Sequence, residues 1–191
     1  YSLNPYDARN GALVVNFNTV YLKVDKNGVI SSAEEQTPLT PLTKHLGKKL
    51  PSGIHRINIP PESGFAYAGE LLQAIFLRHG LSFKNSKVSL RQVSSAGQLV
   101  YRHYNNLNLQ DLIAGMMLYS NNFTANQLLL TTGMKRFGSP ASLKKGRLAV
   151  KEYLTKELGI SADQFRIAEG SGISRENRLT PDTVLLLLKA F

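Results

Sequence analysis

The sequence contains no cysteine, which excludes thiolate catalysis, disulfide bonds and zinc sites built on cysteine. Its four histidines are scattered, and no two are spaced to bind one ion from a single helix face, so the sequence predicts no metal site. Long apolar runs are missing too. The longest, residues 184–188, falls far short of the roughly 18 residues that cross a bilayer, and we expect no transmembrane segment.

Both ends of the sequence lack the features of complete ends. Residues 1–5 have neither the basic start nor the apolar stretch of a signal peptide, and there is no initiator methionine. At the other end, the sequence stops at Phe191 in the middle of a helical pattern. We therefore expect the chain to be a fragment of a longer protein.

Acidic residues are few, and the formal net charge is +10. Basic residues are densest in a segment that we call the basic stretch, residues 135–156, where they face only Glu152: Lys135, Arg136, Lys144, Lys145, Arg147, Lys151 and Lys156. Such a surface attracts polyanions, either nucleic acid or an anionic envelope polymer. An ordinary solvated helix face is the third interpretation. The stretch offers few aromatic rings for base stacking, which disfavours nucleic acid.

The first third of the sequence predicts strands. Residues 12–24 are rich in β-branched and aromatic side chains, and Asn27-Gly28 is a strong turn signal before the pattern resumes. Residues 31–51 are polar and interrupted by prolines, which indicates a loop. A further short strand is expected at residues 54–59, and Pro60-Pro61 marks the predicted domain boundary.

Beyond that boundary the sequence predicts mainly helices, so the expected fold class is α+β. Apolar residues at spacings of three and four place Leu109, Leu112, Ile113, Met116 and Met117 on one helix face. The other expected elements are helices at 63–80, 123–130 (ending at Gly133), 142–158 (ending at Gly159) and from 180 onward, a strand pair at 88–93 and 99–101 around the turn 94–97, and a strand at 165–167.

Ser120-Asn121-Asn122 interrupts two apolar helices and is the first candidate for chemistry. A polar corner between helices can direct the hydroxyl of Ser120 and the carboxamide of Asn122 into one cleft. A hydroxyl can relay a proton, and an amide can both donate to and accept from a peptide. The structural alternative is a helix C-cap followed by an N-cap.

The order of two motif stretches, residues 119–128 and 169–181, resembles the class C low-molecular-mass penicillin-binding proteins, the D-alanyl-D-alanine carboxypeptidase/endopeptidase family. Residues 12–24 are similar to the accessory β segment of that family, and residues 65–69 to the start of a helix in its catalytic domain. The resemblance implies that residues 1–60 are the remainder of an accessory β domain and a linker. Residues 61–191 would be the mainly helical part of a β-lactamase/transpeptidase-like domain.

The resemblance also implies residue roles. Ser120 would shuttle a proton to the leaving amine, and Asn122 would hold the substrate amide. Asn121 stands where the family more often has Asp, and Glu169 where it has a shorter carboxylate, for which we expect no catalytic duty. Asn121, Gly170, Ser171 and Gly172 would border the cleft, the glycines by permitting a tight turn and a close approach of the backbone. Arg175 and Asn177 are expected to pin that turn rather than to touch substrate.

Two further motifs belong to this superfamily, Ser-x-x-Lys with the nucleophile and Lys-Thr-Gly. Residues 142–145 match the first formally, and residues 144–146 roughly mimic the second. These matches overlap and follow Ser120, and we expect Ser142 to cap a helix. The nucleophile would then precede Tyr1 and the Lys-Thr-Gly strand would follow Phe191. By itself the chain is expected neither to hydrolyse peptides nor to bind penicillin covalently.

The resemblance implies a peptidoglycan peptide as the substrate, an acyl-enzyme route without metal or cofactor, and a periplasmic or cell-envelope location. β-Lactams would bind only to the complete enzyme, and no nucleic acid is expected as a partner. The alternative is a basic non-catalytic module that binds nucleic acid or an anionic envelope polymer, and a third possibility is a degenerate family member that serves as a scaffold. Carboxypeptidase and endopeptidase action are both compatible with the sequence.

Overall fold

The computed structural model describes residues 5–85, 87–92 and 96–190 and divides into two compact units, Tyr1–His103 and Tyr104–Phe191. It contains both helices and a sheet, which confirms the predicted α+β class. The predicted assignment of residues 1–60 and 61–191 to two domains stays a prediction. None of the described helices has the length and apolar character that crossing a bilayer requires.

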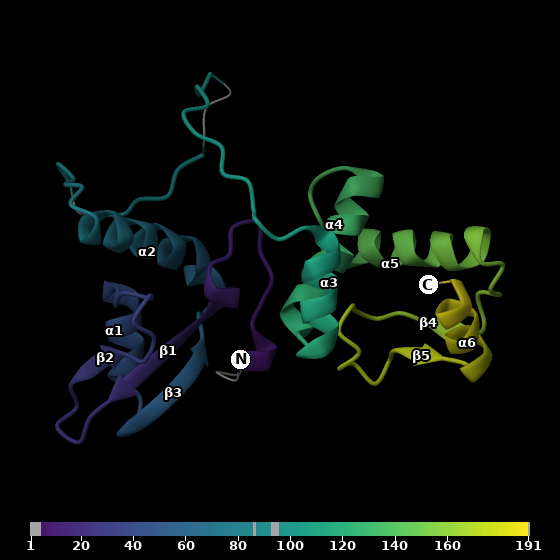
Figure 1. Cartoon of the computed structure of the whole chain (residues 1–191), viewed down its shortest axis with the longest axis horizontal. Helices are drawn as coiled ribbons and strands as arrows, with labels where there is room; N and C mark the ends of the chain where they lie inside the picture. Colours follow the sequence, from purple (N-terminus) through teal and green to yellow (C-terminus); the bar gives the residue numbers. More distant parts are fainter. Residues whose placement is uncertain (1–4, 86, 93–95, 191) are drawn as a thin grey trace. The chain divides into compact units, whose positions relative to one another are not determined.

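The first unit is built on an antiparallel sheet in the order β2-β1-β3 (Figure 1). Its strands are β1 (Thr19–Val24), β2 (Ile30–Ser32) and β3 (Gly53–Asn58). The predicted turn at Asn27-Gly28 is confirmed, because Gly28 adopts a left-handed φ of 78°. The Asp25 carboxylate accepts from the N–H groups of Asn27 and Val29, both at 2.8 Å, and so closes the turn.

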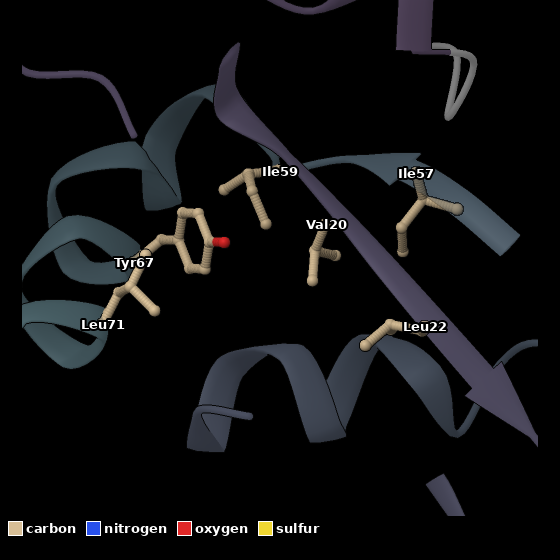
Figure 2. Packing of buried hydrophobic residues seen from close by; sticks show 6 residues of the cluster. All are labelled: Val20, Leu22, Ile57, Ile59, Tyr67 and Leu71. Carbon is tan, nitrogen blue, oxygen red and sulfur yellow. The ribbon is translucent and has the colours of Figure 1, made fainter. Parts of the chain in front are cut away.

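The same unit contains two helices, α1 (Pro41–Gly47) and α2 (Gly64–Arg78) (Figure 1). Val20 and Leu22 are two positions apart, so they share one face of β1, and they pack in one cluster with Tyr67 and Leu71 of α2 (Figure 2). Tyr67 and Leu22 are fully buried in this core. Because α2 packs its apolar face here, the first compact unit extends well past residue 60.

The predicted strand at residues 12–24 is wrong over its first half. Asn16, Phe17 and Asn18 all adopt left-handed backbone with φ of 48°, 55° and 52°, and they form the short 3-10 turn η2 (Asn16–Asn18). Asn18 donates from its side chain to the Arg9 carbonyl at 2.8 Å. Asparagine tolerates left-handed backbone better than most residues, which allows this turn to precede β1.

The predicted loop at residues 31–51 is also corrected, since it contains β2 and α1. Thr40 caps α1, and the Thr40 and Thr43 side chains and backbones bond reciprocally in a capping box. Pro41 occupies the first helical position, where its missing N–H costs nothing. Thr-Pro is a typical helix start, so Pro41 begins a helix here and does not break one.

The strand pair predicted at residues 88–93 and 99–101 is absent from the described part of this segment, which has no regular structure. Val93, Ser94 and Ser95 lie outside the described residues. Before this segment, α2 ends where predicted, with Gly80 at φ 82°, whereas Ser63 makes no side-chain cap bond. The first unit also contains the 3-10 turns η1 (Pro5–Asp7) and η3 (Pro61–Ser63).

The second unit is mainly helical. Its elements are α3 (Leu109–Leu118), α4 (Asn122–Phe137), α5 (Leu143–Glu152), the π-helical turn η4 (Tyr153–Glu157), the strands β4 (Phe165–Arg166) and β5 (Arg178–Leu179), and α6 (Pro181–Ala190). The sequence predicts that this helix ends at Gly133, but α4 continues through Gly133 to Phe137. Gly133 instead faces Gly146 of α5. A Cβ on Gly133 would lie 2.3 Å from the Gly146 nitrogen, so two glycines let these helices touch.

Candidate active site

The corner between α3 and α4 is a helix stop followed at once by a helix start. The Ser120 N–H donates to the Met117 carbonyl at 3.4 Å, and the Asn121 N–H donates to the Met116 carbonyl at 2.9 Å. Ser120 itself has a left-handed φ of 50°. These bonds form the C-terminal motif in which glycine normally takes the left-handed position. A serine there is held at a cost of about 1–2 kcal/mol, and such strain often marks functional residues.

Asn121 starts the next helix. Its side-chain oxygen accepts from the Thr124 N–H at 2.9 Å, and this N-cap satisfies a donor that the first turn of α4 would otherwise leave unpaired. The structural alternative, a C-cap followed by an N-cap, is found in kind, but at Tyr119 and Asn121, one residue before Ser120 and Asn122. It does not compete with the functional one, because neither the hydroxyl of Ser120 nor the amide of Asn122 is used in the caps.

A pocket of about 210 Å³ opens at this corner. It is lined by Met116, Met117, Ser120, Asn121, Asn122, Ala125, Gly170 and Ser171. Of the predicted site residues, only Gly172 is not part of this lining. The structure thus brings the Ser-x-Asn corner and the Gly-Ser-Gly turn to one pocket, while the roles predicted for these residues stay predictions.

The turn at residues 168–177 is organised around the Glu169 carboxylate. Glu169 accepts from the N–H groups of Ser171 at 2.7 Å, Gly172 at 2.8 Å and Ser174 at 3.3 Å. The Ser171 hydroxyl and the Asn177 amide also donate to it. Gly172 adopts φ 82°, as expected for the tight turn.

Asn177 pins the turn from its other end. Its side-chain oxygen accepts from the Ala168 N–H at 2.6 Å and from the Glu169 N–H at 3.3 Å. The predicted structural role of Asn177 is thereby confirmed. Arg175 is exposed, and the structure leaves its predicted pinning role as a prediction.

Glu169 is ionised in this setting. Partial burial raises the pKa of the Glu169 carboxyl, but hydrogen bonds from Ser171, Ser174 and Asn126 outweigh it and hold the pKa at about 2. A carboxylate with this pKa cannot supply a proton near neutral pH. The Glu169 carboxylate orients the turn that carries Ser171, a role that the sequence analysis above does not predict. The signal was present, because a carboxylate directly before a Gly-Ser-Gly turn can accept from the N–H groups of that turn.

The turn is seated directly on α4. The Gly170 N–H donates to the Asn126 side-chain oxygen at 2.7 Å, joining residues 44 positions apart. A Cβ on Gly170 would lie 2.6 Å from the Ala125 carbonyl oxygen, so a larger residue does not fit. The predicted close approach of backbone at Gly170 is therefore confirmed. The sequence does not predict that Asn126 and Ala125 contact the turn, because the residues that they contact lie far away in sequence.

The formal Ser-x-x-Lys match at residues 142–145 does not resemble a nucleophile with its base. The Ser142 hydroxyl accepts from the Lys145 N–H at 3.2 Å and caps α5, as predicted. The Lys145 ammonium instead donates to the carbonyls of Gly138 at 2.7 Å and Pro140 at 2.9 Å. Within the described residues, no three His, Asp or Glu side chains gather as a metal site requires.

Comparison with known proteins gives consistent relatives. Residues 56–191 match the family described as "D-Ala-D-Ala carboxypeptidase 3 (S13) family". The chain is 39% identical over 124 residues to D-alanyl-D-alanine carboxypeptidase DacB of Haemophilus influenzae, covering 65% of this chain and 25% of that protein. It is 30% identical over 125 residues to D-alanyl-D-alanine carboxypeptidase of Actinomadura sp. strain R39, covering 64% and 23%.

A solved structure is similar over nearly the whole chain. It is penicillin binding protein 4 (dacB) of Haemophilus influenzae, complexed with a novel β-lactam, with a TM-score of 0.71 at 26% sequence identity. The similarity covers 97% of this chain and 49% of that one. The chain therefore spans about a quarter of the length of the curated relatives and about half of the solved structure.

Proposed function

The chain belongs to the D-Ala-D-Ala carboxypeptidase 3 (S13) family, and from this premise we propose that it is part of a serine-type D-alanyl-D-alanine carboxypeptidase/endopeptidase that acts on peptidoglycan peptides. This family membership agrees with the resemblance predicted from the motif order. The observation that carries the proposal is the single pocket shared by Ser120, Asn122 and Ser171. Its location would be the periplasm or cell envelope.

The reaction would follow an acyl-enzyme route. A serine nucleophile attacks the carbonyl of the scissile D-Ala-D-Ala amide, the C–N bond breaks, and the departing amine takes up a proton. The nucleophile would yield its proton to its neighbouring Lys. We assign relay of a proton to the amine to the Ser120 hydroxyl, which is exposed at the pocket and free of the helix caps: it would donate its own proton and take up the one held by that Lys. Water then releases the acyl group and restores the nucleophile.

Asn122 would orient the substrate. A carboxamide presents a donor and an acceptor together, which suits a peptide amide that offers the same pair. The ionised Glu169 would keep Ser171 and Gly170 at the pocket wall, and its low pKa argues against a proton-transfer role. The nucleophile with its Lys, and the Lys-Thr-Gly strand, would be supplied by sequence outside these 191 residues.

The sharpest test replaces Ser120 with glycine in the complete enzyme. Glycine suits φ 50°, so Ser120→Gly should raise stability by about 1 kcal/mol while removing the hydroxyl. We expect D-Ala release from a D-Ala-D-Ala peptide to fall by about 10²-fold or more. Full activity in a folded Ser120→Gly enzyme would contradict the assigned role.

Asn122→Ala provides the second arm, with Asn105→Ala, an exposed amide before α3, as its matched control. We expect Asn122→Ala to lower kcat/KM and the control to leave it unchanged. In the isolated chain, a fluorescent penicillin should leave no covalent label. Labelling of that chain would place the nucleophile within these residues and overturn the proposed division of the motifs.

A further inference from the structure

A second pocket of the described structure lies between α5 and β4 and has a volume of about 370 Å³; we call it the cationic groove. Lys144, Arg147 and Lys151 line it from α5, and Arg166 lines it from β4. The three α5 residues are spaced by three and four positions, so they share one helix face. No acidic residue is part of the lining.

The rest of the basic stretch is largely occupied elsewhere. Arg136 and Lys156 pair with Glu152 at 3.1 Å and 3.5 Å. The Lys145 ammonium donates to two backbone carbonyls just before α5. Lys135 is exposed and is not part of the groove.

The groove cations differ from these neighbours. Lys144, Arg147 and Lys151 form no ion pair within residues 5–85, 87–92 and 96–190. Arg166 pairs with Glu176 at 2.7 Å, and both side chains of that pair are largely exposed. Like charges on one helix face repel each other, so a helix that merely needed a solvated surface would gain from acids among them. Three of the five cations of the basic stretch that form no ion pair within the described residues therefore lie together where the surface is hollow.

The floor of the groove is apolar. Leu148, 43% exposed, lies between the cations of α5, and Phe165 and Ile167 line the groove from the strand side. Phosphate backbones need cations but gain little from an apolar floor. The one aromatic residue of the lining, Phe165, is only partly exposed, whereas nucleic acids stack successive bases on several rings. A peptide that bears carboxylates and small apolar side chains matches both the charge and the floor.

We propose that the cationic groove is a second substrate-binding site, which holds a carboxylate-bearing peptide of the peptidoglycan polymer away from the Ser120 pocket. The proposal rests on the proposed function for the identity of the polymer. A D-Ala-D-Ala peptide ends in a free carboxylate, and a polymer carries many such peptides. Holding one of them raises the effective concentration of its neighbours at the active site.

Two experiments test the site in the complete protein. The first measures fluorescence anisotropy with two labelled hexapeptides, alternating Ala-Glu and alternating Ala-Gln. The groove variant is K144Q/R147Q/K151Q, and the control is K23Q/K48Q/K49Q, which removes the same charge from exposed residues of the first unit. We expect the groove variant to bind the Ala-Glu peptide at least about tenfold more weakly, and the control less than about twofold.

The unmodified protein supplies a measurement that does not depend on how the variants fold. Its affinity for the Ala-Glu peptide should fall as salt rises from about 10 mM to about 150 mM, and the Ala-Gln peptide should bind weakly throughout. Equal losses in the groove and control variants would overturn the proposal, since they indicate net charge alone. Preferential binding of a DNA oligonucleotide or of anionic lipid vesicles would overturn it as well.

The second experiment compares turnover of two substrates. The groove variant should release D-Ala from a short soluble peptide at the normal rate, but more slowly than the control variant from polymeric peptidoglycan. Equal rates on the polymer would contradict a role as a substrate site. A protein that binds the Ala-Glu peptide through the groove but releases no D-Ala would overturn the proposed function and leave the anion site standing.

Discussion

Replacing Gly170 with alanine tests whether the Glu169 turn is truly seated on α4. The added Cβ would lie 2.6 Å from the Ala125 carbonyl oxygen, 3.0 Å from its carbonyl carbon and 3.1 Å from the Leu129 Cβ. Two of these atoms belong to the helix backbone, which cannot yield without disturbing α4. The turn must therefore move away from the helix.

The expected cost has two parts. Overpacking a close contact costs roughly 1–3 kcal/mol. Lifting the turn also breaks the 2.7 Å hydrogen bond from Gly170 to Asn126, worth about 0.5–1.5 kcal/mol. We expect Gly170→Ala to lower the free energy of unfolding of the second unit by about 2–4 kcal/mol, and to reduce turnover in the complete enzyme because Ser171 shifts with the turn.

Hydrogen exchange followed by mass spectrometry provides the assay, since it reports stability separately for peptides from residues 104–191. Gly115→Ala is the matched control: it makes the same chemical change within α3, where a Cβ has nothing within 4 Å. It should stabilise its helix by about 0.5–1 kcal/mol. If Gly170→Ala leaves exchange of the turn and of α4 unchanged while Gly115→Ala behaves as expected, the seating of the turn on α4 is refuted.

Three further predictions concern single residues. Folding lowers the pKa of Glu169 from 4.5 to about 2, so the stability that its carboxylate contributes is complete above pH 4.5 and is lost as the pH falls toward 2. In urea denaturation, the loss of unfolding free energy caused by Glu169→Gln should therefore shrink over that window. A loss that stays constant with pH would exclude the carboxylate as its source. Ser142→Ala should cost about 1 kcal/mol in thermal denaturation without affecting penicillin labelling of the complete enzyme, whereas lost labelling would restore Ser142 as a catalytic candidate. Leu22→Ala should destabilise the first unit by about 2–5 kcal/mol, and a smaller loss would show that its core collapses around the cavity.

Much of the local structure was readable from the sequence. The Asn27-Gly28 turn, the helix that ends before Ser120 and the cap at Ser142 all depend on residues a few positions apart, and each was predicted correctly. The motif order likewise pointed to the family that the comparisons show. These features were predictable because their physical causes, backbone preference and helical periodicity, act within one element.

The tertiary structure decided what depends on distant contacts. Gly133 reads as a helix stop, yet α4 continues through it because Gly146 of α5 packs against it. The sequence predicts no catalytic duty for Glu169 and no structural one either, whereas the folded turn and its contact with α4 give it the role of hydrogen-bond acceptor. Which cations of the basic stretch line the groove likewise depends on which side of α5 faces β4. Such contacts join residues whose spacing in sequence carries no period, so no local pattern can predict them.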